Sequence, residues 1–283
     1  HLVAGAAYAA GLEAARIAYF YEGRSPLDAL ISGLEAAILK YGDHKPMPGA
    51  EKKSLARVLG ALVYYFEHYP LEKERWVPIN PEGKAGIEFS FAEPFPTDQG
   101  VTGHFQHPNK STPLLFVGRA DMLVKDKLGE HQGIYCLDDK TCSQLGASWA
   151  RQWTHRGQFT GYQWGANQSG FDCRGTIVRG LAFYVNDRYA TMEVLTLRTK
   201  DQVDLWLRDT AMILRHMLES YHYKEFPHND DSACSGYSGC DLSDLCKSKR
   251  MLHFLRNDYT RKIWSPVDQV DMSFEEYFLE YFK

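Results

Sequence analysis

The order of two acidic motifs between residues 118 and 142 constrains this chain more than any other feature of its sequence. Asp121 ends the run G-R-A-D, whereas Asp138 and Lys140 stand at the end of the apolar run I-Y-C-L-D-D-K-T. The surrounding apolar residues predict two strands, and the polar residues 127–130 predict the turn between them. An antiparallel pair of this kind brings the two aspartates side by side.

Two carboxylates held together repel each other, and their burial is costly unless a cation neutralises them. Mg²⁺ and Mn²⁺ prefer oxygen ligands and keep waters that can attack a phosphate. Lys140 is two residues beyond Asp138, so both side chains point to one face of a strand, where the amine could hold the attacking water or stabilise charge on the phosphate. Asp139 points to the other face, although its carbonyl oxygen could still reach the metal. We therefore predict a Mg²⁺ or Mn²⁺ site with Asp121, Asp138 and Asp139 as ligands.

A third motif, Q-F-T-G-Y, follows on a predicted helix. Gln158 and Tyr162 are four residues apart and share one helix face, where they could grip a phosphate or a base. Each motif alone has an ordinary interpretation, because acid–lysine pairs are common on exposed strands and a glutamine–tyrosine pair is typical of a solvated helix. Their fixed order is what indicates a catalytic centre.

The remaining periodicity predicts one mixed α/β domain in the order helices, three strands, helix, two strands, helix. Ser25 and Pro26 are typical of a helix start, and Thr199 with Gln202 forms a capping box. Helices are predicted at about 2–20, 25–41, 51–68, 148–167 and 199–223, and strands at about 87–91, 114–125, 133–141, 176–185 and 190–197. Within this single domain, we expect a helical arm at 1–70, a core at 76–223 and a cysteine-containing lobe at 224–283.

The composition is that of an ordinary globular protein, with 44% hydrophobic and 24% charged residues. No apolar run is long enough for a membrane span, and no signal peptide is evident, so we expect no membrane partner and a reducing cytoplasmic setting. The formal charge of −4 argues against a uniformly basic surface but permits a local basic groove. The most basic stretch, Lys247 to Lys262, is either a solvated surface or a contact for the DNA backbone.

Three cysteines near the carboxyl end, Cys234, Cys240 and Cys246, have the spacing C-x5-C-x5-C. They lie among glycines and turn-forming residues, and thiolates are the ligands of iron–sulfur clusters and of zinc. The spacing predicts a soft-metal site of one of these two kinds.

Together, G-x-x-D, an apolar strand ending in D-x-K-T, and Q-x-x-x-Y resemble the PD-(D/E)XK nuclease superfamily, specifically its RecB-like branch. The resemblance implies an αβββαβ core with a mixed sheet. It also implies that Asp121 and Asp138 bind the metal, that Lys140 is the catalytic lysine, and that Gln158 and Tyr162 contact the substrate.

The family also draws a histidine ligand from an early helix, and there this sequence departs from the pattern. The usual position falls near Tyr8 or Ala9, so His1 is the best substitute, and Glu13 is the other nearby side chain that could bind metal. Several RecB-like nucleases carry three carboxy-terminal cysteines that hold a [4Fe–4S] cluster with a fourth near the amino end. Here no cysteine precedes Cys136, so either the fourth ligand lies upstream of His1, or a group such as His222 or His228 completes a zinc site; of the two, we favour the cluster.

These observations predict a metal-dependent DNA nuclease. The resemblance favours an exonuclease that acts on single strands or duplex ends in recombination or DNA-end processing, with a helicase or recombination partner. It is consistent with a phage-encoded protein acting in the host cytoplasm. The alternative is a catalytically inert DNA-binding subunit that carries a cluster or zinc.

Overall fold

The computed structural model describes residues 2–46, 53–79, 86–96, 114–186 and 188–225, together with residues 240, 242, 245 and 246. Its helices are α1 (Leu2–Phe20), α2 (Pro26–Tyr41), α3 (Leu55–His68), the short 3₁₀ helix η2 (Leu71–Lys73), α4 (Ala147–Arg151), α5 (Gly157–Gln168) and α6 (Lys200–Tyr223). Its strands are β1 (Trp76–Pro78), β2 (Ile87–Pro94), β3 (Leu115–Asp126), β4 (Ile134–Cys142), β5 (Cys173–Phe183) and β6 (Tyr189–Leu197).

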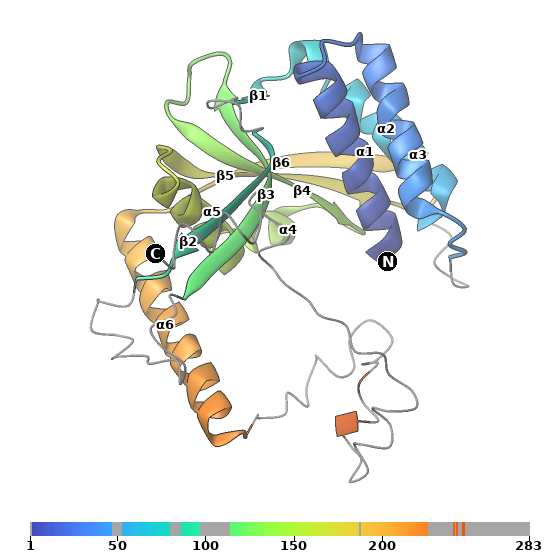
Figure 1. Ribbon diagram of the computed structural model, residues 1–283. Helices are drawn as coiled ribbons and strands as arrows, with labels where there is room; N and C mark the ends of the chain where they lie inside the picture. The colour runs from blue at the N-terminus through green and yellow to red at the C-terminus, as the bar shows by residue number, and fades with distance from the viewer. Residues whose placement is uncertain are drawn as a thin grey trace.

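The strands form one mixed sheet in the order β1-β3-β4-β5-β6, and β2 pairs with β3 beside β1 (Figure 1). β4 and β5 run parallel, joined by a crossover that contains α4 and α5, whereas every other pairing is antiparallel. The succession of α1, β2, β3, β4, α5 and β5 confirms the predicted αβββαβ core.

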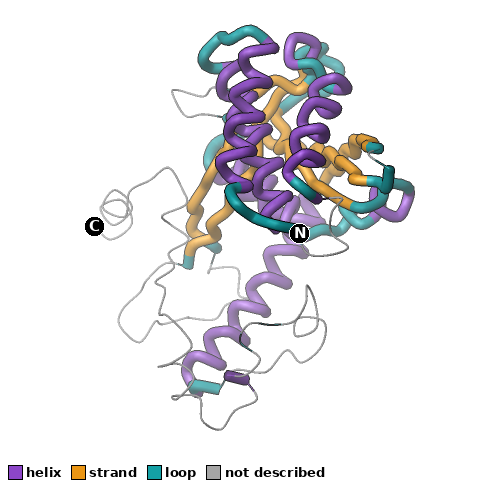
Figure 2. The backbone as a smooth tube through the Cα atoms, turned by 90° about the vertical axis from the view of Figure 1, so that its right-hand side faces the viewer, coloured by secondary structure: helices purple, strands orange, loops and turns teal. Residues whose placement is uncertain are grey.

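Helices cover both faces of the sheet (Figures 1 and 2). On one face α1 and α3 pack on the sheet through Tyr8, Leu62 and Phe183, and Ile17 of α1 packs on Met122 and Leu137. On the other face α5 contributes Ala166 to a cluster with Cys136, and α6 packs beside α5 through Trp206. In the described part of the chain, no helix has the length and hydrophobicity that a membrane crossing needs.

The predicted helix caps are confirmed. The Ser25 side chain accepts a hydrogen bond from the backbone N–H of Asp28, and Pro26 opens α2. Thr199 and Gln202 form the reciprocal bonds of a capping box at the start of α6. These local signals fix where α2 and α6 begin because they satisfy N–H groups that have no partner inside the helix.

Two predicted helix boundaries were wrong. The third helix begins at Leu55 rather than at residue 51. The helix expected at 148–167 is divided into α4 and α5, with an interruption at 152–156. Arg198, which directly follows β6, donates hydrogen bonds to the carbonyls of Trp153 (2.9 Å) and Arg156 (3.5 Å). Because a distant side chain satisfies these carbonyls, the chain can leave the helix there without losing hydrogen bonds.

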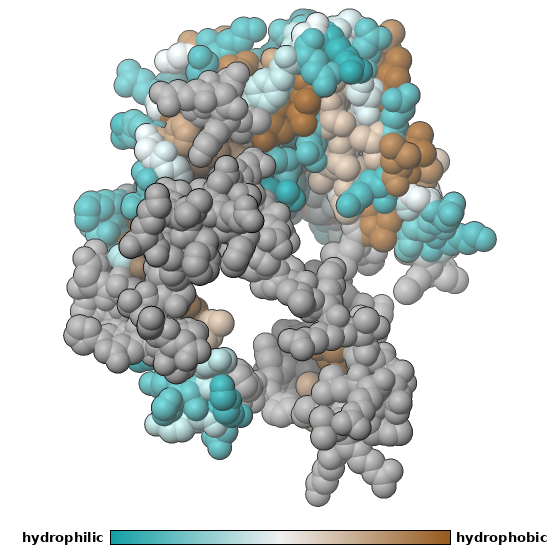
Figure 3. All heavy atoms as spheres, in the orientation of Figure 1, coloured by the Kyte–Doolittle hydropathy of each residue, from teal (hydrophilic) through white to brown (hydrophobic). Residues whose placement is uncertain are grey.

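Small residues bring α1 and α2 into close contact. A Cβ atom on Gly33 of α2 would lie 2.6 Å from the carbonyl oxygen of Gly11 in α1, so only glycine fits. Of the periodic apolar residues of α2, Leu34 packs on the core, whereas Leu27 and Ile31 are exposed. Figure 3 accordingly shows hydrophobic residues among hydrophilic ones over the helical layer at the right.

Candidate active site

The two predicted acids lie where β3 and β4 stop pairing. Their backbone register ends at Met122 opposite Leu137, so Asp121 and Asp138 are the next facing pair. Beyond that point the backbone N–H of Asp139 donates a hydrogen bond to Oδ2 of Asp121, over 2.8 Å. A side chain of β3 thus replaces the next ladder bond, and the strands part around the acid pair.

The neighbouring strand β2 shows why Asp121 lies at an irregular point of the sheet. Ile87 pairs with Met122 and Phe89 pairs with Ala120, which places Glu88 opposite Asp121. Ile87 and Met122 pack toward α1, whereas Phe89 and Ala120 pack toward α5. Residues two apart would share a face in a regular strand, so both strands slip by one residue at this pair. Glu88 has φ +53°, a backbone conformation that non-glycine residues rarely adopt.

Asp138 is almost completely buried, with 1% of its side chain exposed, and Lys140 makes an ion pair with it on the same face of β4. Burial, followed by the charge of Asp121, raises the pKa of Asp138 to about 8 although Lys140 opposes the shift. Burial and the charge of Asp139 raise the pKa of Asp121 as well. The protein therefore places two carboxyl groups where full ionisation is costly without more positive charge.

Glu88 is an acidic residue at this site that the sequence analysis did not identify. Burial and the charge of Asp121 raise the pKa of Glu88 to about 7, and the Arg119 guanidinium opposes the shift from 2.9 Å. Glu13 of α1 adds a smaller repulsion. The alternating run I-E-F-S-F predicts a strand but gives no sign of the slip that turns Glu88 toward Asp121.

The side chain of Asp139 points to the opposite face of β4, toward α1 and α3. It makes an ion pair with Arg16 (2.7 Å) and accepts a hydrogen bond from the Tyr65 hydroxyl (2.9 Å). Neither Arg16 nor Tyr65 was identified from the sequence. A lone arginine within the alanine-rich run 2–20 is the signal that could have indicated a buried acidic partner.

Gln158 and Tyr162 share one face of α5, as predicted, because the Gln158 amide donates to the Tyr162 hydroxyl over 2.8 Å. Gln158 is exposed, and Tyr162 is half-buried against the sheet. Burial and the charge of Asp138 raise the pKa of Tyr162 above its ordinary range. The Tyr162 hydroxyl therefore lies within the electrostatic range of the acid pair.

The acid pair fits a divalent cation in the chemistry of its donors. Carboxylate oxygens are the ligands that Mg²⁺ and Mn²⁺ prefer, and a cation would relieve the repulsion that raises both pKa values. Within the described residues, however, no three His, Cys, Asp or Glu side chains are gathered as a metal-binding group. Asp121 and Asp138 would hold the ion, and the remaining ligands must come from other groups.

Some of the predicted metal ligands lie outside the described residues, and others lie within them. His1 and Cys234 are among the residues that the structure does not describe. Cys240 and Cys246 are described and carry free thiols. The cysteine site therefore stays a prediction.

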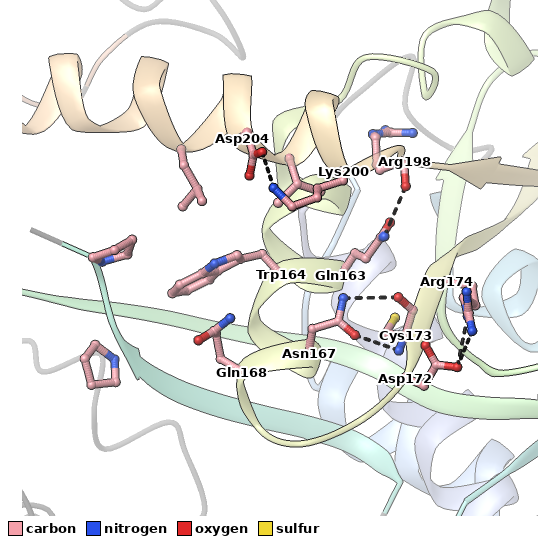
Figure 4. A pocket seen from close by; sticks show the side chains of 14 residues that line it. Gln163, Trp164, Asn167, Gln168, Asp172, Cys173, Arg174, Arg198, Lys200 and Asp204 are labelled. Atoms are coloured by element: carbon pink, nitrogen blue, oxygen red, sulfur yellow. Dashed lines mark hydrogen bonds and ion pairs between the residues drawn. The ribbon is translucent and has the colours of Figure 1, made fainter. Parts of the chain in front are cut away.

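A cavity of about 530 Å³ lies apart from the acid pair, at the carboxyl-terminal half of α5 (Figure 4). Gln163 and Asn167 line it together with the start of α6, and none of the predicted catalytic residues does. Lys200 pairs with Asp204 there, and Arg174 pairs with Asp172. Because the predicted catalytic residues lie elsewhere, we place the candidate active site at the acid pair rather than in the cavity.

Comparison with known proteins assigns the chain to a family. The family model of the PD-(D/E)XK nuclease superfamily matches residues 8–247. No curated protein matches the chain. A candidate exonuclease from Eubacterium rectale is similar in structure, with 11% sequence identity, 93% of this chain and 79% of that chain covered, and a TM-score of 0.42. A second solved structure, that of SSO0001, has 14% identity, 72% and 74% coverage and a TM-score of 0.29.

Both solved structures are only distantly similar to this chain, so the family assignment depends on the family model alone. That model spans most of the sequence, including both acids, the lysine and the glutamine–tyrosine pair. The chain belongs to the PD-(D/E)XK nuclease superfamily.

Proposed function

We propose that this protein is a metal-dependent deoxyribonuclease of the RecB-like branch, which hydrolyses phosphodiester bonds from DNA ends. The observation that carries the proposal is the pairing of Asp121 with the buried Asp138, with Lys140 beside it, where two strands part. A nuclease needs such a carboxylate pair to hold cations against a phosphate. In a purely structural role, nothing would offset the free energy that burial of the two carboxylates costs.

The chain supplies metal ligands and a hydrogen-bond donor to this reaction. Asp121 and Asp138 bind a Mg²⁺ or Mn²⁺ ion, which supplies positive charge for the phosphate and lowers the pKa of water. The Lys140 side chain is 31% exposed and its amine is ion-paired with Asp138, which places it to donate to the attacking water or to a phosphate oxygen. The carbonyl of Asp139 follows on the same strand and is our candidate for a further metal ligand, with His1 as another.

Gln158 and Tyr162 form the substrate side of the site. Their mutual hydrogen bond fixes the Tyr162 hydroxyl, while the exposed Gln158 keeps its carbonyl for a ligand. Fixed polar groups next to the acid pair are suited to position a nucleotide before cleavage.

The test is cleavage of labelled linear DNA with Mn²⁺, compared between wild type and Asp138→Ala. We expect wild type to release nucleotides and the variant to lose about a thousand-fold in rate, the equivalent of about 4 kcal/mol in the barrier. Asp172→Ala, which removes an exposed ion pair with Arg174, is the matched control and should cleave normally. Intact DNA with wild type at every metal and salt concentration would favour the inert DNA-binding subunit.

A covalently closed circle of the same sequence tests the exonuclease assignment. An exonuclease leaves the circle intact and degrades it only after linearisation. Rapid cleavage of the circle would instead identify an endonuclease.

We further propose that Cys234, Cys240 and Cys246 bind a [4Fe–4S] cluster that stabilises the carboxyl-terminal lobe. Their even spacing supports this assignment, with zinc as the alternative. Protein purified without oxygen should be brown and contain about four irons per chain. A colourless protein with one zinc would overturn the cluster. Recombination or DNA-end processing with a helicase partner, by a phage-encoded protein in the host cytoplasm, is the setting that we propose for this activity.

A further inference from the structure

We propose that Arg16 and Tyr65 are positioning residues of the nuclease site, which act through Asp139 to hold the backbone that orients Asp121. This inference rests on the proposed nuclease activity and adds to it two residues from the opposite face of the sheet. The juxtaposition that carries it is Arg16 of α1 and Tyr65 of α3 on the single carboxylate between Asp138 and Lys140.

The three side chains form a closed triangle. Nη2 of Arg16 lies 2.7 Å from Oδ2 of Asp139 and donates to the Tyr65 hydroxyl over 2.8 Å. The hydroxyl in turn donates to Oδ1 of Asp139 over 2.9 Å. Both carboxylate oxygens are therefore held, and the side chains of Arg16 and Asp139 are only 4% and 3% exposed.

A second buried arginine holds the triangle against the sheet. Arg179 of β5 donates to the Tyr65 hydroxyl over 3.1 Å and makes two hydrogen bonds to Glu74, of 2.7 and 2.8 Å. It also donates to Glu193 of β6 over 2.8 Å. Because Tyr65 is fixed from two sides, it can hold the Asp139 carboxylate in one position.

The link from the triangle to the acid pair is one backbone amide. The N–H of Asp139 donates to Oδ2 of Asp121, so the orientation of this amide determines where the Asp121 carboxylate lies. The ladder between β3 and β4 has already ended at this point, so no backbone partner from β3 fixes the amide, whereas on its other edge β4 stays paired with β5, with Asp139 opposite Arg179. The side chain of Asp139 is therefore a further anchor of the amide, from the side of α1 and α3, and Arg16 and Tyr65 hold that anchor.

Arg16 is also the guanidinium that neutralises the buried carboxylate of Asp139 on the face of β4 opposite Asp138. Without it, Asp139 would carry a buried, uncompensated charge on the residue whose backbone N–H holds Asp121. An uncompensated buried charge of this kind is strongly destabilising.

The experiment compares Arg16→Met, Arg16→Lys and Tyr65→Phe in the full chain, using kcat, KM for linear DNA and Mn²⁺ affinity measured by calorimetry without DNA. We expect Arg16→Met to lower kcat and Mn²⁺ affinity by about 10- to 100-fold, with KM for DNA unchanged. Losses of this size are typical when a residue that orients a metal ligand is removed. Arg16→Lys should recover part of the loss. Tyr65→Phe keeps the ring and both charges, so it should fold and lose less than Arg16→Met.

The matched control is Arg75→Met. Arg75 holds Asp126 at the far end of β3 with bonds of 3.1 and 2.8 Å and does not contact the acid pair. It should lose stability while kcat and Mn²⁺ affinity stay at wild-type values. Combining Arg16→Met with Asp139→Asn should cost no more than the larger single change, because both remove one interaction.

An active wild type with unchanged Mn²⁺ affinity in Arg16→Met and Tyr65→Phe would overturn this inference and leave the nuclease assignment intact. Losses that add in the double variant, or that Arg75→Met reproduces, would also overturn it by showing a general effect on folding. An inactive wild type would instead refute the proposed function itself.

Discussion

Asp138 and Asp139 are neighbours on β4 and are about equally buried, with 1% and 3% of their side chains exposed, yet they face opposite environments. Asp139 points toward α1 and α3 and finds both an arginine and a tyrosine hydroxyl there. Asp138 points toward α5 and finds there a second carboxylate, Asp121, and one partly exposed lysine, Lys140.

The difference shows that burial alone does not mark a functional acid. A buried carboxylate that the fold supplies with rigid partners is part of the framework, whereas one left beside another carboxylate needs a ligand to complete it. The stability of variants can separate the two cases, because removing charge should destabilise one face of β4 and stabilise the other.

The largest effect should follow Asp139→Asn. The change leaves the buried Arg16 guanidinium without its counter-charge, which typically costs about 3–5 kcal/mol in the free energy of unfolding. Urea denaturation measures it. Asp172→Asn, at an exposed pair with Arg174, should cost at most about 1 kcal/mol. Equal losses in the two variants would mean that Asp139 is no better held than a surface residue.

Asp138→Asn should have the opposite sign in metal-free protein. The amide keeps the shape of the side chain and removes the repulsion with Asp121 that raises the pKa of Asp138 to about 8. At pH 8 in EDTA we expect a gain of at least about 1.4 kcal/mol, the equivalent of one pKa unit. A destabilised variant would show that the ion pair with Lys140 outweighs the repulsion.

The gain from Asp138→Asn should depend on pH in a defined direction. An unfolded chain releases the Asp138 proton near the ordinary pKa of 3.8, whereas the folded protein retains it until about pH 8. Between these values the folded state binds more protons, so rising pH destabilises wild type relative to the variant, by at most about 1.4 kcal/mol per pH unit. The difference should be absent below pH 4 and level off above pH 8. Unfolding curves of both proteins across this range measure it, and a flat difference would contradict the shift.

The sequence was sufficient where local chemistry decides the structure. Ser25 with Pro26 and Thr199 with Gln202 satisfy helix ends within four residues, and the helices began there. The two-residue spacing of Asp138 and Lys140 was enough to place both on one face, because strand periodicity is a local property.

Non-local partners account for what the sequence could not give. The interruption between α4 and α5 depends on Arg198, which lies 42 to 45 residues further along the chain. The contact between Arg16 and Asp139 joins residues on α1 and β4 that no spacing relates. The slip at Glu88 arises from the pairing of β2 with β3, and its own sequence alternates regularly.

That slip gives the smallest of the expected effects and tests the geometry around Asp121 directly. Alanine ordinarily stabilises a strand by about 0.5–1 kcal/mol relative to glycine, because glycine loses more backbone freedom on folding. At φ +53° the order should invert, since a Cβ atom costs about 1–2 kcal/mol in this region. We therefore expect Glu88→Gly to be about 1 kcal/mol more stable than Glu88→Ala. Both variants lose the ion pair with Arg119 equally, so their difference isolates the backbone. The ordinary order, alanine above glycine, would mean that β2 passes Asp121 as a regular strand and that the slip does not position this acid.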